Sequence, residues 1–366
     1  MTRAPGRAVI AATAMACALL ATTGCTSLAE RIAIPRSNAV LSDEQADMFR
    51  DVGITRDATA VSPGVTLSWW RVPPASRDVE YTFERTRGGA SFSMAVPNIG
   101  DDAAPLPARG TVVYLHGWNM DATTMLLWAL VLADHGYRGV AVDLRGHGAS
   151  TDAPLGFGSR EAGDIARLLE RLDTATLTPP VYLVGVSYGA ATALLAEPSV
   201  RDRVAGIIAI APYANAADGI RGAVAGMLDD RGTGIGSRLR HALMRLRHGG
   251  EDIDRAIAEA AALLDLDLSG IDVVDVVART RTCTLLLHGA KDDLVPVDAS
   301  RRLAAASRLV RYREFSDETH VSLPMRIDLL GDPIVTWLDA VAAGDCPALG
   351  GTGRARPTHR PAAPAR

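Results

Sequence analysis

The sequence is poor in lysine and cysteine, and it carries no excess of positive charge. Its 366 residues include four cysteines and a single lysine, Lys291, so that nearly every cation is an arginine. We attach no function to this bias of composition. The formal net charge of −4 offers no basic field for a polyanion, and a nucleic-acid partner is therefore not expected.

The sequence also lacks an apolar run of clear membrane-spanning length near its N-terminus. The run from Ala8 to about Thr23 is shorter than the roughly 20 residues that a bilayer-spanning helix needs. Arg3 and Arg7 precede it, and small residues follow it. A cationic flank, a short apolar stretch and small residues before a break indicate a secretory signal segment.

The end of this segment, Ala21-Thr22-Thr23-Gly24-Cys25, resembles a bacterial lipobox. The resemblance implies that residues 1–24 are a lipoprotein signal peptide and that Cys25 becomes the acylated N-terminus, an anchor to the membrane. Thr26 after the cysteine favours the periplasmic side of the outer membrane over the inner membrane of a bacterial envelope. The alternative is an ordinary signal peptide in which Cys25 is incidental.

Two further cysteines, Cys283 and Cys346, remain in the mature chain. An exported protein meets an oxidising compartment, which favours a disulfide between them. Cys283 precedes a predicted strand at 284–287, and Cys346 follows the last predicted helix, which should run back to the same end of the sheet. Two unpaired thiols are the alternative.

The rest of the chain predicts an α/β core that is interrupted once. Residues 25–75 are interpreted as a tether and an irregular segment, and 79–84 and 90–96 as half-buried strands. Strands and helices then alternate, which is typical of a mostly parallel sheet with helices on both faces. The predicted domains are a first core part at 76–214, a helical cap at 215–281, a second core part at 282–345 and a disordered tail at 346–366.

Within the predicted cap, residues 238–247 indicate a basic amphipathic helix, because leucines share one face and arginines the remaining surface. Such a helix can lie on an anionic membrane. A cap element with a solvated outer face is the interpretation that we favour.

The motif Gly185-Val186-Ser187-Tyr188-Gly189 stands between an apolar run and a helix-forming stretch. A serine on a sharp strand-to-helix turn needs glycines two residues to either side, because a β-carbon there would strike neighbouring backbone. The turn presents the hydroxyl of Ser187 at the carboxyl end of a sheet. The context predicts a nucleophile.

A serine nucleophile requires a base, and the base requires a carboxylate that orients it. Asp292 and Asp293 follow the strand at 284–287, and His320 follows a further predicted strand at 311–315. Only His320 and His359 come after the acid, and His359 lies in the predicted tail. If His320 were a surface histidine, Ser187 would have no base.

On these motifs, together with His116-Gly117-Trp118-Asn119 and residues 143–150, the chain resembles the α/β-hydrolase superfamily. Within it, the chain is similar to capped serine esterases, monoacylglycerol lipases and serine aminopeptidase-like hydrolases. The resemblance implies an α/β-hydrolase fold with an inserted helical cap. In the pattern of this superfamily the acid stands three residues after a glycine and three before a valine. Gly289 and Val295 are those residues here, and the pattern therefore selects Asp292 over Asp293.

The same resemblance implies an oxyanion hole formed by the backbone N–H groups of Trp118 and Tyr188. His116 and His147, with Asp143 nearby, suggest a metal site at first sight, but the resemblance places them in loops that shape the active site. The Trp118 ring either narrows the acyl side of the pocket or packs under the cap. Neither a metal nor an organic cofactor is expected.

The predicted activity is that of a carboxylesterase or lipase acting on lipid-like or small hydrophobic acyl esters. It proceeds through an acyl-enzyme on Ser187, with Asp292 and His320 completing the triad. An aminopeptidase, amidase or thioesterase with the same triad is the alternative. A non-catalytic envelope binding protein on this scaffold is less favoured, because binding alone needs none of the three residues. The sequence makes no prediction of an oligomeric state.

Overall fold

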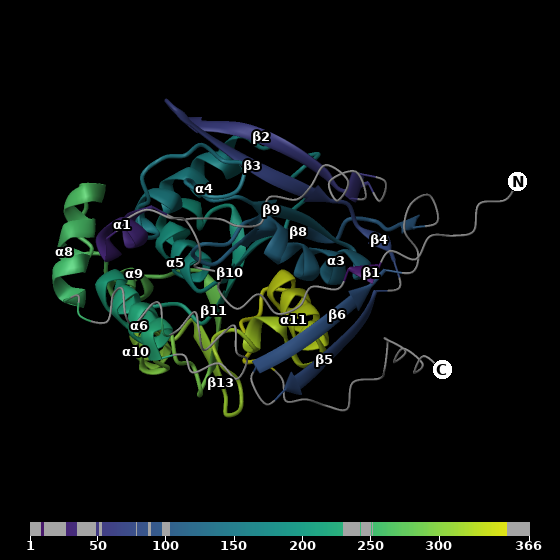
Figure 1. The fold of residues 1–366 in the computed structure, drawn as a ribbon. Helices are drawn as coiled ribbons and strands as arrows, with labels where there is room; N and C mark the ends of the chain where they lie inside the picture. The colour runs from purple at the N-terminus through teal and green to yellow at the C-terminus, as the bar shows by residue number, and fades with distance from the viewer. Residues whose placement is uncertain are drawn as a thin grey trace, which may run out of the picture.

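A central sheet of eight strands organises the protein (Figure 1). The computed structural model describes residues 9–10, 27–34, 49–50, 53–77, 79–86, 89–96, 103–229, 242, 250 and 252–349. The strands of the central sheet, in spatial order, are β13 (Val310–Phe315), β12 (Cys283–Gly289), β11 (Val204–Ile210), β10 (Val181–Val186), β8 (Gly110–Leu115), β9 (Tyr137–Val142), β3 (Val65–Val72) and β2 (Thr55–Ser62).

The six strands from β13 to β9 pair in parallel, whereas β3 pairs antiparallel with both β9 and β2. Every residue of β8, β10 and β12 is buried, as expected for parallel strands covered on both faces. The α/β fold class with a mostly parallel sheet is thus confirmed.

Helices cover both faces of this sheet and divide the core in two. The helices that flank the strands are α3 (Leu126–Asp134), α4 (Ser159–Arg171), α5 (Tyr188–Val200), α10 (Asp298–Ala306) and α11 (Ile327–Ala342), with short 3-10 turns η1 (Ala122–Met125) and η2 (Leu323–Met325). Successive residues of one strand point to opposite faces. Accordingly Leu183 belongs to the apolar cluster that includes residues of α4, α5 and α10, whereas Val184 belongs to the cluster that includes residues of α3 and α11.

The prediction of irregular structure over residues 25–75 is wrong, because β2 and β3 lie there. β3 carries a strand signal that the prediction missed: residues 65–69 alternate apolar and polar side chains, and the alternation is interrupted only where Trp69 and Trp70 stand side by side. β2 is mostly exposed at the sheet edge and needs few apolar residues. Ser62-Pro63 begins the tight turn that joins the two strands, and Gly64 completes the turn with φ of 74°.

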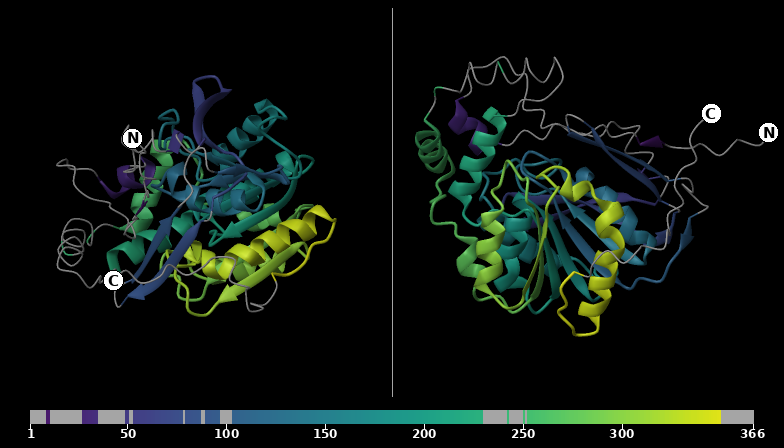
Figure 2. Two further views of the ribbon diagram at one scale, coloured as in Figure 1. Left: turned by 90° about the vertical axis from the view of Figure 1, so that its right-hand side faces the viewer. Right: turned by 90° about the horizontal axis from the view of Figure 1, so that it is seen from below.

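A helix also occupies part of the predicted tether. α1 (Leu28–Ala33) begins with a capping box between Ser27 and Glu30 and buries four apolar side chains. It packs against α8 (Ile253–Leu264), which lies in the predicted cap (Figure 2). The chain that follows Cys25 is therefore docked on the molecule within three residues.

The described elements between 215 and 281 are helices: α6 (Ala216–Asp229), α8 and α9 (Val273–Val277). The predicted basic helix at 238–247 lies outside the described residues, except for Ala242. Cys25 and the tail from 350 onward also lie outside them, and of the predicted signal segment only β1 (Val9–Ile10) is described. No described helix has the length and apolarity of a bilayer span.

The half-buried strands predicted near 79–84 and 90–96 exist as β5 (Glu80–Thr86) and β6 (Gly89–Ala95), but they stand apart from the central sheet. They form an antiparallel hairpin, and β1 pairs with the free edge of β6. Two further short strands, β4 (Ala75–Ser76) and β7 (Ala104–Pro105), pair with each other.

A disulfide joins Cys283 and Cys346, with their Cα atoms 5.6 Å apart. Cys283 is the first residue of β12, and Cys346 follows the end of α11. The helix thus runs back to the amino end of the sheet, which is the geometry on which the predicted pairing depended.

Candidate active site

Ser187 occupies the turn between β10 and α5. Its backbone has φ of 53° and ψ of −111°, a conformation that costs a non-glycine residue about 1–3 kcal/mol. The backbone N–H of Ser187 donates to the carbonyl oxygen of Ile210 at 2.8 Å, which ties the turn to β11. The strained turn is thus held by the sheet, and the serine stands at the carboxyl edge of the parallel strands.

The two flanking glycines are required by close backbone approach. A β-carbon on Gly185 would lie 2.3 Å from the carbonyl oxygen of Gly189. One on Gly189 would lie 2.2 Å from the carbonyl oxygen of Leu115 in β8. Both distances are far inside van der Waals contact with atoms that cannot move aside. The steric reason for this spacing therefore holds in the folded chain.

Asp292 and His320 are in direct contact. The Nδ1–H group of His320 donates to Oδ2 of Asp292 at 2.7 Å. Asp292 follows β12 and its side chain is fully buried, whereas His320 follows β13 and keeps 11% of its side chain exposed. With the proton held at Nδ1, the Nε2 atom is left as the basic nitrogen.

Ser187 lies at the same edge of the sheet, because β10, β12 and β13 run parallel and each of the three residues follows its own strand. Among the described residues, no hydrogen bond joins the Ser187 hydroxyl to the His320 ring. Catalytic hydrogen bonds of this kind are often long in a protein without substrate and shorten in the substrate complex.

The Asp292 carboxylate accepts more than the one bond that the sequence predicts. Its Oδ1 atom accepts from the backbone N–H groups of Leu294 at 3.0 Å and Val295 at 2.8 Å. Its Oδ2 atom lies 3.0 Å from Nε2 of His288, a fully buried residue of β12. Four donors thus surround one carboxylate.

His288 is the functional residue that the sequence reasoning missed. Its Nε2 atom faces two acceptors, the Asp292 carboxylate and the carbonyl oxygen of Val295, so this nitrogen must carry a proton. Its Nδ1 atom then accepts from the hydroxyl of Ser300 at 2.6 Å. The available signal was a histidine inside an apolar strand, four residues before the acid.

These contacts determine the charge of Asp292. Burial by itself raises the pKa of the carboxyl, but the charge of His320 and the hydrogen bonds from His288 and His320 outweigh it. The net result holds the pKa of Asp292 well below its ordinary value, so the group is ionised throughout the neutral range. Among the described residues, no hydrogen bond or ion pair reaches the neighbouring carboxylate of Asp293, and His359 lies outside them.

The loop after β8 passes directly beside the serine. A β-carbon on Gly117 would lie 3.8 Å from the β-carbon of Ser187. Trp118 follows in this loop, and its partly buried side chain packs against the apolar cluster that contains Tyr188. Gly117, the residue before Trp118, is thus the part of this loop that lies next to the turn of Ser187.

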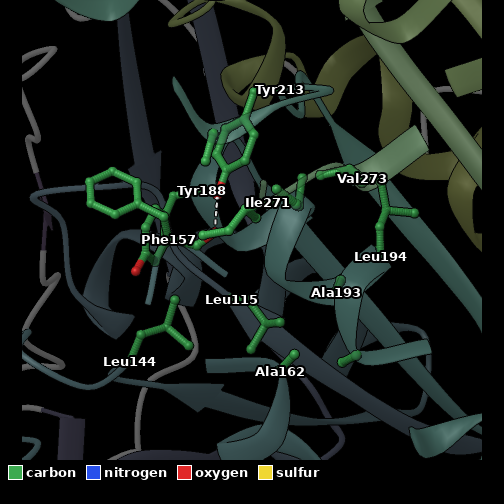
Figure 3. Packing of buried hydrophobic residues seen from close by; sticks show 14 of the residues in the cluster. Leu115, Leu144, Phe157, Ala162, Tyr188, Ala193, Leu194, Tyr213, Ile271 and Val273 are labelled. Atoms are coloured by element: carbon green, nitrogen blue, oxygen red, sulfur yellow. Dashed lines mark hydrogen bonds between the residues drawn. The ribbon is translucent and has the colours of Figure 1, made fainter. Parts of the chain in front are cut away.

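Tyr188 is the first residue of α5, so its backbone N–H is one of the helix N-terminal donors without an intrahelical partner. Its side chain is fixed by packing: the ring contacts those of His147 and Phe157, with centroids 5.9 and 5.8 Å away. Figure 3 shows Phe157 beside Tyr188, and the Tyr213 hydroxyl donates to the Phe157 carbonyl at 2.7 Å. This packing holds the start of α5 in place.

The remaining polar residues of the predicted loops hold backbone in place. Asp143 accepts from the N–H groups of Ala122 at 2.8 Å and Ala149 at 3.0 Å, and burial raises the pKa of Asp143 to about 6. The Arg145 guanidinium makes a two-pronged ion pair with Asp164, at 2.6 and 2.8 Å.

The two buried histidines of these loops have backbone partners as well. The Nε2 atom of His116 accepts from the Leu144 N–H at 3.0 Å, and burial lowers the pKa of His116 to about 4. Burial also lowers the pKa of His147 to about 3, so both rings are neutral. In the part of the chain that the structure describes, no cluster of three or more His, Cys, Asp or Glu side chains could hold a metal ion.

Comparison with known proteins agrees with this architecture. Residues 112–328, more than half of the chain, match the family described as the alpha/beta hydrolase family. No curated protein sequence matches the chain.

Three similar solved structures share the fold at low sequence identity. An esterase of Pyrococcus furiosus is 15% identical, with a TM-score of 0.56, over 86% of this chain and 99% of that one. A membrane phospholipase A, described as a bacterial virulence factor, is 16% identical, with a TM-score of 0.51, over 81% and 89%. Est1E from Butyrivibrio proteoclasticus, with bound ferulic acid, is 14% identical, with a TM-score of 0.50, over 78% and 99%.

Proposed function

Because this chain belongs to the alpha/beta hydrolase family, we propose that it is a serine hydrolase of carboxylic esters, with Ser187 as nucleophile, His320 as base and Asp292 as the orienting acid. The observation that carries the proposal is the hydrogen bond from His320 Nδ1 to the buried Asp292 carboxylate, at the same sheet edge as the strained turn of Ser187. A binding scaffold has no use for that combination.

In the proposed reaction the Ser187 oxygen attacks the acyl carbon of the ester while its proton passes to Nε2 of His320. The carbonyl oxygen becomes an oxyanion beside the N–H groups of Trp118 and Tyr188. The bond to the alkoxide then breaks, and the alkoxide takes the proton from His320. Water repeats the sequence on the acyl-enzyme, releases the acid and returns the serine.

The surroundings of the loop after β8 favour a substrate with an apolar acyl group, because Trp118 in this loop packs against an apolar cluster that extends into α6. The similar structures are an esterase, a membrane phospholipase A and a protein with bound ferulic acid, and these descriptions apply to those proteins. They make esters the first compounds to test. The proposed substrates are lipid-like or small hydrophobic acyl esters.

The decisive experiment is labelling of the folded protein with a fluorophosphonate, with Ser187→Ala as the control. We expect labelling of the wild type alone, followed by turnover in a series of p-nitrophenyl esters from acetate to palmitate. Aminoacyl and acyl amides form a parallel series. Amide turnover with little ester turnover would show that amides, not esters, are the substrate class. Absence of labelling in the wild type would refute the proposal of a serine hydrolase.

We further propose that the protein is a lipoprotein anchored through Cys25 in the bacterial envelope, with the periplasmic side of the outer membrane favoured. Ser27, the N-cap of α1, is only two residues from Cys25, a reach of about 7 Å in an extended chain. Palmitate labelling that is lost in Cys25→Ser, and membrane fractionation of both forms, test the anchor. Wild-type protein that carries no palmitate would contradict it.

A further inference from the structure

The β5–β6 hairpin, which is not part of the central sheet, contacts the segment that carries His320. β5 lies against α11, and the loop between β13 and α11 passes beside it (Figure 1). The Tyr81 hydroxyl of β5 donates to the carbonyl oxygen of Met325. The guanidinium of Arg326 stacks over the ring of Phe83, 4.8 Å from its centroid. The hairpin is therefore attached to the chain just after His320.

Arg85, near the end of β5, reaches the same segment just before His320. One of its terminal nitrogens donates to the backbone carbonyl of Asp317 at 2.5 Å, and the other to Oε1 of Glu318 at 2.5 Å. Such a forked contact fixes both position and direction, which a single ammonium group would not do. Tyr81 and Arg85 thus hold the His320 segment from its two ends.

Glu318 is the centre of these contacts. It is 2% exposed, and its carboxylate accepts from Arg85, Arg326 and the hydroxyl of Ser322, the last at 2.6 Å. Ser322 also accepts from the backbone N–H of Thr319 at 2.8 Å. Glu318 and Ser322, which stand two residues before and two residues after His320, are therefore joined by a hydrogen bond to one buried carboxylate.

The backbone of Glu318 continues the connection to the acid of the site. Its carbonyl oxygen accepts from the N–H of Lys291 at 3.0 Å, next to Asp292. The approach is so close that a β-carbon on Gly289 would lie 2.2 Å from that oxygen. Arg85, Glu318 and the Asp292 loop consequently form one continuous set of contacts.

We propose that the β5–β6 hairpin is a brace for the catalytic histidine, in which Arg85 and Glu318 are positioning residues that hold the His320 ring toward Ser187. The inference rests on the proposed serine hydrolase function. The hairpin lies before residues 112–328, the part that matches the family, so the brace is supplied by chain outside that match. Within the described part of the chain the His320 ring makes one hydrogen bond, to Asp292, so the orientation of the ring also depends on the loop that carries it.

The test is Arg85→Met, assayed on the p-nitrophenyl ester that the wild type hydrolyses best. Because the Arg85 guanidinium contacts Asp317 and Glu318 rather than His320, we expect kcat to fall about tenfold while KM stays within about twofold, the result of a misplaced catalytic group. Arg71→Met is the matched control: the Arg71 side chain is 39% exposed against 45% for Arg85, and its guanidinium pairs with Asp57 in the β2–β3 hairpin. Its kcat should be unchanged.

A kcat for Arg85→Met within about twofold of the wild type, in protein with an unchanged melting temperature, overturns the brace. Arg85→Lys keeps the charge without the fork, so its kcat should fall between those of the wild type and Arg85→Met. A lysine variant slower than the methionine variant would also count against the proposal. This variant keeps the test available if Arg85→Met folds poorly.

Glu318→Gln supplies the second arm. If Arg85 acts through Glu318, the double variant loses less kcat than the product of the two single losses. Independent effects that multiply would refute the connection. Failure of the proposed function is distinguishable from failure of the brace. If the proposed function is wrong, the wild type itself neither reacts with the fluorophosphonate nor hydrolyses the ester.

Discussion

Replacing Asp292 by asparagine perturbs the proposed triad at a position where the contacts allow the outcome to be worked out. The carboxylate accepts from four donors: two backbone N–H groups and the rings of His320 and His288. An asparagine has one oxygen for these four. The two backbone donors cannot turn away, so its oxygen should face them and its NH₂ group should face the two rings.

In that arrangement His320 can no longer place its proton on Nδ1, because it would meet another donor there. The proton moves to Nε2, the atom that should accept the proton of Ser187, and the base is lost. The wrong tautomer of a triad histidine costs about 10⁴ in kcat, or roughly 5.5 kcal/mol of transition-state stabilisation. KM should change little, because the Asp292 side chain is fully buried and contacts the His320 ring.

The assay is steady-state ester hydrolysis together with the rate of fluorophosphonate labelling, with melting temperatures to establish that the variants are folded. Asp293→Asn is the matched control, since no hydrogen bond or ion pair among the described residues reaches that carboxylate; we expect kcat within about twofold. The reasoning is refuted if Asp292→Asn keeps more than a tenth of wild-type kcat, or if Asp293→Asn is equally damaged.

Three further outcomes are expected. Because the pKa of Asp292 is lower in the folded protein than its unfolded value of about 4, the carboxylate stabilises the fold above that pH, and this stability is lost as pH falls through the folded pKa. His288→Asn removes one donor to the carboxylate, so acid unfolding followed by circular dichroism should begin at higher pH than in the wild type. An unchanged transition would argue against this role of His288. Gly189→Ala places a β-carbon 2.2 Å from a β8 carbonyl oxygen and should disrupt the turn that bears Ser187. Soluble variant protein that reacts with the fluorophosphonate as fast as the wild type would contradict the steric argument. Replacing Cys283 and Cys346 by serine opens a loop with a sequence separation of 63 and should cost about 4 kcal/mol in urea unfolding; a loss below 1 kcal/mol would count against that contribution.

Features that depend on short stretches of chain could be predicted from the sequence. The strand, the sharp turn and the helix around Ser187 are local, and the glycines are required by backbone a few residues away or in the adjacent strand. The order of Asp292 and His320 along the chain, each after its own strand, was also enough to bring them to one sheet edge. The α/β class followed from the alternation of strands and helices.

The edge strand β2 and the second imidazole on Asp292 could not be predicted in this way. β2 is a mostly exposed edge strand with few apolar residues, whereas β3 alternates apolar and polar residues over 65–69 and could have been recognised as a strand. His288 acts on Asp292 because β12 and the turn that follows it bring the two side chains together, which no pattern of letters specifies.

By itself, then, the sequence determined which side chains could react and at which end of the sheet they stand, because turn stereochemistry and strand direction are local properties. Only the tertiary structure decided how firmly they are held. The contact between Arg85 and Glu318 joins positions 233 residues apart, and such a contact exists only after the intervening chain has packed into the sheet between them.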